Sequence, residues 1–578
     1  MSSALDAASL VMIPSGYENG TLGSLKPTDG TGDFTFSRGS DISATRVNEQ
    51  GYIEKGYENF LLQSNSFLTS PWEIQFGSHT LTSGQLGYDG TNDAWLVQKE
   101  SSVNHYVKQS ISVSGINTFS FYAKNNTTNG AGGILIDSGL GGVVFNLENG
   151  TIYYQTGVNA SIEPINNDWY RCSFTFNGSS SLLRFQVVSA SGSDDVIGKS
   201  IYIQDAMLNQ GMVAYPYVET TTAPVAGGIL EDEPRLDYSG GASCPSLLLE
   251  PQRTNFITQS EYIDGSYWTK DRVTISNNAT TSPEGKLNAS KIIEDSQNGI
   301  HRIFRTISGT NNVLSFFAKA DERQWISVFS SDASYSYFNV GDGTLGTIAS
   351  GSTATIEDYG NGWYRCSLHN FYSSSAIINI TTGNGDAAYQ GDGTSGLYIY
   401  GIQVEQATYP TSYIPTNGTS QTRLKDVCVD AGDASTFNDS EGVLYIEIAT
   451  LANDGTRTIT LSDGGNSNSI YIGYNTNGRL DVNLRSGGVY QAAFNYTGVA
   501  NPSEINKIAF KYKQNDFALW VNGVEVGTDS SGITPIGLDK LNFSTTNAVA
   551  DFFFGNVNQV LYFPTALSDD ECIELTTI

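Results

Sequence analysis

The sequence contains one block twice, as NDWYRCSF at 167–174 and as NGWYRCSL at 361–368. Three further blocks repeat in the same order, and each second copy follows the first by about 194–196 residues. These pairs are ENFLLQSNSF (58–67) with TNFITQSEYI (254–263), NTFSFYAK (117–124) with NVLSFFAK (312–319), and YIQDAMLNQ (202–210) with YIYGIQVEQ (398–406). The chain is therefore predicted to hold two copies of one domain of roughly 160–170 residues.

The alternation of side chains within these blocks predicts β-strands. In WYRCSF (169–174), Tyr170, Cys172 and Phe174 fall on one face of an extended chain, and a mixed set falls on the other. The other repeated blocks keep this two-residue period, and residues typical of turns separate them. Helical periodicity is weak throughout the repeats. The fold class is predicted to be all-β, with each copy a jelly-roll β-sandwich.

A third unit with its own strand pattern follows the repeats. Asn522 and Gly523 lie between alternating apolar residues and predict a two-residue hairpin. Ser568 and Glu571 predict a capping box that begins a helix of about two turns. The predicted parts are an N-terminal arm (1–58), a first jelly roll (59–222), a connector (223–254), a second jelly roll (255–417), a linker (418–438) and a third β-sandwich (439–578).

The charge balance excludes several classes of partner. The chain has 30 basic and 59 acidic side chains, which gives a formal net charge of −29. Such a surface repels phosphate backbones and anionic lipid, so neither nucleic-acid binding nor membrane insertion is predicted. No apolar run approaches the roughly 20 residues of a membrane helix. The N-terminal residues also lack the pattern of a secretion signal, so we expect the protein to be made and assembled inside a cell.

The cysteines predict neither a disulfide framework nor a zinc site. The five are widely spaced, odd in number and without a CxxC pair: Cys172, Cys244, Cys366, Cys428 and Cys572. Cys172 and Cys366 occupy the same strand position in the two copies. We interpret both as reduced core residues.

The arm and the connector each contain one short apolar segment. SLVMIP (9–14) cannot bury itself alone, so it must dock on a partner or complete the first sandwich, and both alternatives stay open. LLLEP (247–251) is too short for a helix and is predicted to lie extended across a sandwich. The acidic run at 231–233 is interpreted as solvated.

The sequence predicts no enzyme. Glycosidases need two carboxylates about 5–10 Å apart across a cleft. The third unit offers Glu441, Glu447, Asp481 and Glu525 without the strand spacing of such a pair, and the histidines are scattered. No metal-ligand spacing is present, so no cofactor is predicted. A structural calcium ion held by turn carbonyls and one aspartate stays open, because such a site leaves no motif.

Exposed aromatic rings on a sheet are the usual feature of sugar-binding sandwiches. In the second repeat, Trp325, Tyr335 and Tyr337 have this character, and the first repeat has no aromatic residue at the place of Trp325. We predict these three residues as a carbohydrate-binding site. The alternative is that they are core residues, as aromatic residues of sandwich strands commonly are.

Three stretches resemble known proteins. TFSRGSDISATRVNEQGYIE (35–54), PRLDYSGGASCPSLLLEPQRTN (234–255) and QVEQATYPTSYIPT (403–416) resemble segments of tailed-bacteriophage virion fibre and spike proteins, including head fibres. The repeats are similar to jelly rolls of the carbohydrate-binding-module type. The third unit, which ends FPTALSDDECIEL (563–575), is similar to a concanavalin A-like, laminin-G-like sandwich.

The resemblance implies a structural head fibre or spike at the virion surface, assembled in the host cytoplasm. It implies a multimer, commonly a homotrimer, that contacts other virion proteins through the N-terminal arm and adheres to host or environmental glycans. A tail fibre or receptor-binding protein, or a free-standing carbohydrate-binding protein, are the alternatives. In such proteins the connector commonly continues the ATRVN strand, whereas here the first repeat lies between them. That insertion leaves the path of the arm open.

Overall fold

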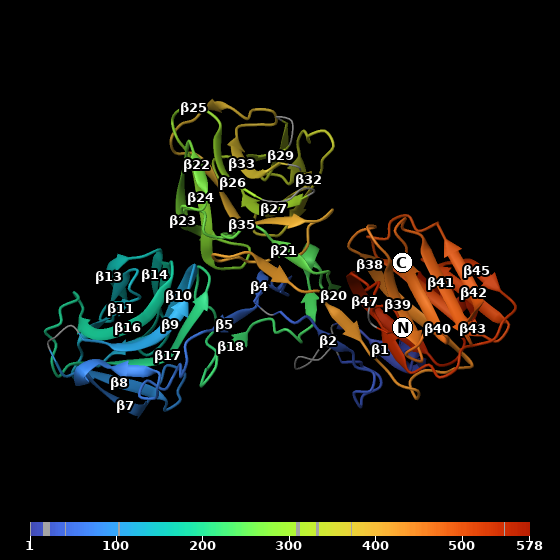
Figure 1. Ribbon diagram of the computed structural model, residues 1–578, viewed down its shortest axis with the longest axis horizontal. Helices are drawn as coiled ribbons and strands as arrows, with labels where there is room; N and C mark the ends of the chain where they lie inside the picture. The colour runs from blue at the N-terminus through green and yellow to red at the C-terminus, as the bar shows by residue number, and fades with distance from the viewer. Residues whose placement is uncertain are drawn as a thin grey trace.

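The protein is almost entirely β-structure and forms three lobes around a central junction (Figure 1). The computed structural model describes residues 2–14, 23–40, 42–101, 105–307, 312–330, 334–371, 373–547 and 550–577. The α-helices within these ranges are α1 (Ser2–Ala7) and α2 (Asp569–Thr576). The predicted all-β fold class is confirmed. None of the helices described is both long and apolar enough to span a bilayer.

The first lobe is a sandwich of two sheets, each with six strands in the described residues. One sheet has the order β14 (Asn159–Pro164), β15 (Trp169–Asn177), β10 (Ile116–Asn125), β17 (Ser200–Gln210), β8 (Ala94–Lys99), β7 (His79–Gln85). The other has the order β13 (Thr151–Thr156), β12 (Gly142–Asn146), β11 (Gly132–Asp137), β16 (Ser180–Ser189), β9 (Val107–Val113), β6 (Trp72–Ile74).

The second lobe repeats this architecture. One sheet has the order β23 (Val273–Thr281), β24 (Leu287–Glu294), β35 (Gly396–Gln406), β27 (Asn312–Lys319), β32 (Trp363–Phe371), β31 (Thr353–Asp358). The other has the order β22 (Thr269–Asp271), β26 (His301–Thr306), β33 (Ser375–Thr381), β28 (Trp325–Phe329), β29 (Tyr335–Asn339), β30 (Thr344–Leu345). A short pair, β25 (Asn298–Gly299) with β34 (Tyr389–Gln390), lies beside them.

The two copies agree down to single hydrogen bonds. The indole nitrogen of Trp72 donates to the carbonyl of Gln63 at 3.0 Å, and that of Trp268 donates to the carbonyl of Gln259 at 2.9 Å. Both tryptophans are buried. Trp72 and Trp268 therefore pack in the same way in the two lobes.

The core of each jelly roll lies between its two sheets. Cys172 and Cys366 are fully buried there among aliphatic and aromatic side chains, and both are free thiols. Burial raises the pKa of both thiols well above the ordinary value. The interpretation of both cysteines as core residues is confirmed.

The third lobe packs a large sheet against a smaller one. The large sheet has the order β19 (Arg235–Asp237), β20 (Ser246–Leu249), β47 (Gly555–Phe563), β38 (Glu441–Thr450), β43 (Asn506–Lys513), β44 (Asp516–Val521), β45 (Val524–Asp529). The smaller sheet has the order β42 (Val489–Tyr496), β41 (Leu480–Ser486), β40 (Ser469–Tyr474), β39 (Arg457–Ser462), β46 (Lys540–Asn542).

Two local predictions for this lobe are confirmed. Asn522 and Gly523 have φ of 50° and 81° and join β44 to β45 as a tight hairpin. The amide of Ser568 donates to the Glu571 carboxylate at 2.8 Å, and the amide of Glu571 donates to Ser568 Oγ at 3.3 Å. This capping box begins α2.

The N-terminal apolar segment belongs to the third lobe. Its strand, β1 (Leu10–Met12), pairs with β47 through Leu10–Tyr562 and Met12–Val560. Because β38 pairs along the opposite edge of β47, β1 and β20 share the remaining edge. The alternative in which this segment completes the first sandwich is wrong, because its partner strand β47 belongs to the third lobe. Both chain ends consequently lie in one lobe (Figure 1).

Short strand pairs build the junction between the lobes. They are β2 (Thr35–Ser37) with β37 (Val427–Val429), β3 (Thr45–Val47) with β4 (Ile53–Lys55), β5 (Tyr57–Asn59) with β18 (Val225–Gly227), and β21 (Arg253–Asn255) with β36 (Gln421–Arg423). Pairing of β5 with β18 brings together the entry and the exit of the first lobe. The amide of Val47 donates to Asp237 Oδ1 at 2.9 Å, so the arm and the connector lie side by side. The first lobe is thus an insertion between two segments that remain in contact.

Candidate functional site

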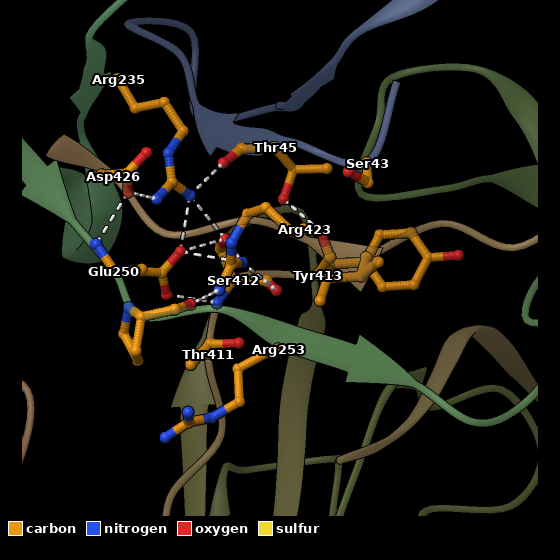
Figure 2. Close-up of polar contacts among 12 residues, drawn as sticks. Ser43, Thr45, Arg235, Glu250, Arg253, Thr411, Ser412, Tyr413, Arg423 and Asp426 are labelled. Atoms are coloured by element: carbon orange, nitrogen blue, oxygen red, sulfur yellow. Dashed lines mark hydrogen bonds and ion pairs between the residues drawn. The ribbon is translucent and has the colours of Figure 1, made fainter. Parts of the chain in front are cut away.

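Charged side chains from distant segments meet in the centre of the junction (Figure 2). Arg235 and Arg423 contact the carboxylate of Glu250 at 2.5 and 2.9 Å. Arg38 contacts Asp426 at 3.3 Å, and Arg235 also pairs with Asp426. All five side chains are buried, so we call them the arginine hub. Several of them come from the motifs that carry the resemblance to virion proteins.

The arginine hub is electrostatically satisfied. Burial would raise the pKa of Glu250, but Arg423 and Arg235 outweigh it and lower this pKa to about 2. Backbone carbonyls accept further guanidinium protons: Arg38 donates to Leu230, and Arg423 donates to Pro251 at 3.2 Å. A buried and paired cluster of this kind joins distant segments of the chain.

A second buried cluster connects the first two lobes. Lys55 lies 2.5 Å from both the Glu261 and the Glu284 carboxylates and donates to the Tyr400 hydroxyl at 2.6 Å. Tyr215, from the first lobe, donates to Glu284 at 3.0 Å. Burial opposes the charge of Lys55, yet the two carboxylates raise its pKa above the ordinary value. We call this set the lysine hub.

The residues predicted to bind sugar lie on one face of the second lobe. Trp325 is on β28, and Tyr335 and Tyr337 are on the adjacent strand β29. The alternate residues Ile326 and Val328 point into the core, so the three aromatic side chains are on the outer face of the sheet. The structure therefore brings the predicted residues together, outside the core.

This face is covered in part. Trp325 and Tyr335 are half-buried, whereas Tyr337 is only 5% exposed. A Cβ atom added to Gly346 would lie 2.9 Å from both Trp325 and Tyr337, so the chain after β30 passes directly over them. The ring of Tyr337 is thus not presented to solvent. Sugar binding by these three residues stays a prediction.

A groove of about 360 Å³ lies on the third lobe. Tyr471, Asn483 and Arg485 line it from β40 and β41, and their neighbours along these strands point into the core. The groove is therefore on the outer face of the smaller sheet. We call it the sheet groove.

The sheet groove combines an exposed ring with polar groups. The guanidinium of Arg485 lies 4.2 Å from the centre of the Tyr490 ring and donates to its hydroxyl. Tyr490 is 54% exposed. Thr458 donates to the hydroxyl of Tyr471 at 3.3 Å. Such a surface can stack on the apolar face of a pyranose ring while hydrogen-bonding its hydroxyl groups.

Sequence reasoning missed Tyr471 and Tyr490. A signal was present in SIYIGY (469–474), where Tyr471 stands between Ile470 and Ile472 and must face away from the core if they face toward it. Tyr490 follows a Gly-Gly turn at the start of an edge strand, where alternation gives little information. Only the folded sheet brings the two rings to one groove.

Glu441, Glu447 and Asp481, three of the four carboxylates considered for catalysis, have structural partners. Glu441 pairs with Lys513 at 2.9 Å. Glu447 accepts from Asn558 at 3.0 Å. Asp481 lines the sheet groove, where Arg479 holds it at 2.6 and 3.0 Å. Over the described ranges, no group of three or more His, Cys, Asp or Glu side chains is arranged to hold a metal ion.

Comparison with known proteins identifies the fold of the third lobe. The family model described as the Concanavalin A-like lectin/glucanases superfamily matches residues 429–572. The third lobe is therefore a concanavalin A-like domain, as the sequence predicted. A search of curated proteins found no match.

Solved structures give further likenesses of fold. The CBM40 module of Ruminococcus gnavus IT-sialidase is 19% identical, with 25% of this chain and 92% of that chain covered and a TM-score of 0.23. The leech intramolecular trans-sialidase is 17% identical, with 24% of each chain covered and a TM-score of 0.22. The binding domain of botulinum neurotoxin serotype G is 13% identical, with 26% and 40% covered and a TM-score of 0.22.

Proposed function

We propose that this protein is a non-catalytic glycan-binding protein whose concanavalin A-like lobe holds sugar in the sheet groove. The observation that carries the proposal is the exposed ring of Tyr490 beside Arg485 and Tyr471 on an outer sheet face. The matched family, named for lectins and glucanases, supports carbohydrate as the ligand class. Trp325 and Tyr335 form a second candidate sugar surface on the middle lobe.

The proposal extends to the biological setting. The chain is a multimeric, homotrimeric appendage of a tailed-phage virion, such as a head fibre or spike, attached through its N-terminal region. The supporting observation is the resemblance of the segments that hold Arg38, Arg235 and Glu250, which meet in the arginine hub. Because Leu10–Met12 is buried on β47, attachment to other virion proteins uses the exposed surface of the N-terminal region.

A glycan array probed with the full chain tests sugar binding. We expect Tyr490→Ala to reduce binding at least tenfold for the glycans that the sheet groove holds, because the stacking ring is lost. Tyr153→Ala is the matched control, since Tyr153 is a 60% exposed ring on β13 of the first lobe. Trp325→Ala tests the second candidate surface. Absence of any glycan binding by the unaltered chain contradicts the proposed function.

Light scattering on the purified protein tests the assembly. A mass three times that of one chain is expected for the homotrimeric appendage. A monomer at all concentrations would favour a free-standing carbohydrate-binding protein instead.

A further inference from the structure

A cleft of about 690 Å³ opens at the junction, next to the arginine hub. Its walls come from the arm, the connector, the second lobe and the third lobe, so it exists only when all four are assembled. The volume falls in the range of about 300–1,000 Å³ typical of ligand sites, which are frequent at domain interfaces. We call it the junction cleft. It is separate from the sheet groove.

The floor of the junction cleft is held rigidly. Glu250 and Ser412 line it, and the amide and hydroxyl of Ser412 donate to the Glu250 carboxylate at 2.7 and 2.6 Å (Figure 2). Since Glu250 is itself fixed by two arginines, ligand binding would require little rearrangement of this surface. A site that is already ordered loses little conformational entropy on binding.

The rim carries two acidic side chains that form no salt bridge within the described residues. Glu357 and Asp358, at the end of β31, are exposed and form no ion pair with the rest of the described chain. Asp358 accepts from the amide of Gly360 at 2.7 Å. Unpaired carboxylates repel an anionic ligand and accept hydrogen bonds from hydroxyl groups.

The walls supply rings and one unused donor. Tyr238 and Tyr359 are half-buried, and the ring of Tyr359 is fixed edge-on against Phe317 at 4.9 Å. Arg365 is only 5% exposed, and its Nε atom has no partner within the described residues. At a cleft wall such an N–H group can donate to a ligand oxygen.

The second guanidinium on the wall is already occupied. Arg46 pairs with Glu54 at 2.8 Å and with Glu233 at 3.5 Å. Arg365 lies across from Glu357 in the register of β31 and β32, and the carboxylates of Glu357 and Asp358 outnumber this one guanidinium, so the rim disfavours a phosphate, sulfate or carboxylate. The remaining features of the cleft are rings, acceptors and a single donor, which together match a hydroxyl-rich ligand with apolar ring faces.

We propose that the junction cleft is a second ligand site that binds a neutral oligosaccharide, with Glu357 and Asp358 accepting from its hydroxyl groups and Tyr238 stacking on a sugar ring. The inference rests on the proposed glycan-binding function and adds a site and a ligand class to it. A peptide segment from another subunit is the competing occupant.

The experiment uses full-length protein with Tyr490→Ala, which removes the ring of the sheet groove, on an array of neutral and sialylated glycans. Binding to neutral glycans should persist. Adding Glu357→Gln and Tyr238→Ala should then reduce that binding at least tenfold. Glu163→Ala is the matched control, because Glu163 pairs across from Arg171 in the first lobe as Glu357 pairs across from Arg365 in the second. It should leave binding unchanged.

Three results would overturn the inference while the proposed function stands. They are loss of all glycan binding with Tyr490→Ala alone, residual binding that the cleft substitutions do not change, and residual binding restricted to sialylated glycans. Failure of the unaltered chain to bind any glycan overturns both. Thermal unfolding of each variant separates a lost contact from a lost fold, and the isosteric Glu357→Gln measured alone still tests the rim if Tyr238→Ala unfolds the protein.

Discussion

At the residue scale, the arginine hub shows why buried charges appear in an otherwise polar-surfaced β-protein. Burying Arg235 and Glu250 costs free energy of hydration. Their mutual attraction offsets that cost only when the contacts are close and hydrogen-bonded. The two terminal nitrogens of Arg235 have such close geometry, with contacts to two carboxylates, the carbonyl of Thr45 and the hydroxyl of Ser412. An apolar cluster could stabilise the junction equally. It would not specify one alignment of the arm with the connector, because apolar contacts are not directional.

The depressed pKa of Glu250 predicts a dependence of stability on acid. Its pKa falls from an ordinary 4.5 to about 2 on folding, so the folded state favours the carboxylate. The resulting stabilisation, on the order of 3 kcal/mol, is complete above pH 4.5 and is lost as the pH falls from 4.5 toward 2. Urea unfolding between pH 7 and pH 2.5 should show this decline.

Glu250→Gln provides the control for that titration. The variant should be less stable at pH 7 by about 3–5 kcal/mol, because two arginines lose a buried partner. Its stability should then fall less steeply between pH 4.5 and pH 2.5 than that of the unaltered protein. Parallel pH profiles for the two proteins would contradict the role assigned to Glu250.

At the element scale, β1 and β20 protect the edge of β47. Without these two strands, one side of β47 would have unpaired amide and carbonyl groups, which could pair with the strands of other chains. Here two segments from distant parts of the sequence pair with the same edge, and helix α2 covers the outer face of the sheet near the N-terminus. The concanavalin A-like lobe is thus completed by residues outside the matched range.

Truncation of Leu10 tests this dependence. Leu10 is fully buried in the core of the third lobe, so Leu10→Ala should reduce the free energy of unfolding by about 2–5 kcal/mol. Leu25→Ala is the matched control, because Leu25 is 47% exposed, and it should change stability by less than about 0.5 kcal/mol. Chemical denaturation followed by tryptophan fluorescence measures both. Equal effects would mean that β1 contributes nothing to the lobe.

The capping box of α2 makes a smaller contribution. Ser568→Ala removes the side chain that accepts from the Glu571 amide and should cost about 1 kcal/mol. Ser568→Asp keeps an acceptor and should restore most of that stability. Thermal unfolding of the three proteins tests the order, and an alanine variant as stable as the unaltered protein would contradict it.

At the scale of the whole molecule, two buried hubs set how the lobes are arranged. The lysine hub joins the arm and the first two lobes through Lys55, Glu284 and Tyr215. The arginine hub joins the arm, the connector and the linker before the third lobe. The lobes therefore form one assembly, and the junction cleft depends on it.

Lys55→Met tests the arrangement of the lobes. The substitution leaves Glu261 and Glu284 buried without a cation, which should cost about 3–5 kcal/mol. Small-angle X-ray scattering should show a larger radius of gyration, because the first two lobes separate before either unfolds. Lys199→Met is the control, since Lys199 is exposed, and it should change neither measurement. An unchanged radius of gyration in the Lys55 variant would mean that the lysine hub stabilises its own surroundings but does not hold the two lobes together.

The sequence by itself determined the duplicated jelly rolls, the buried cysteines, the hairpin at Asn522-Gly523 and the capped final helix. Each of these depends on alternation or on turn chemistry between near neighbours, which the order of residues records directly. The sequence did not predict how far Trp325 and Tyr337 are exposed. The segment at Gly346 covers them, and tertiary packing sets its path.

Only the tertiary structure decided the rest. It paired β1, near the start of the chain, with β47, near its end. It also joined Arg235 to Asp426 and Glu250 and brought Tyr471 and Tyr490 to one groove. Long-range pairings of this kind depend on which distant surfaces are left unburied once each lobe has formed, and no local pattern encodes that. For the same reason, the junction cleft has no signature in any single stretch of the chain.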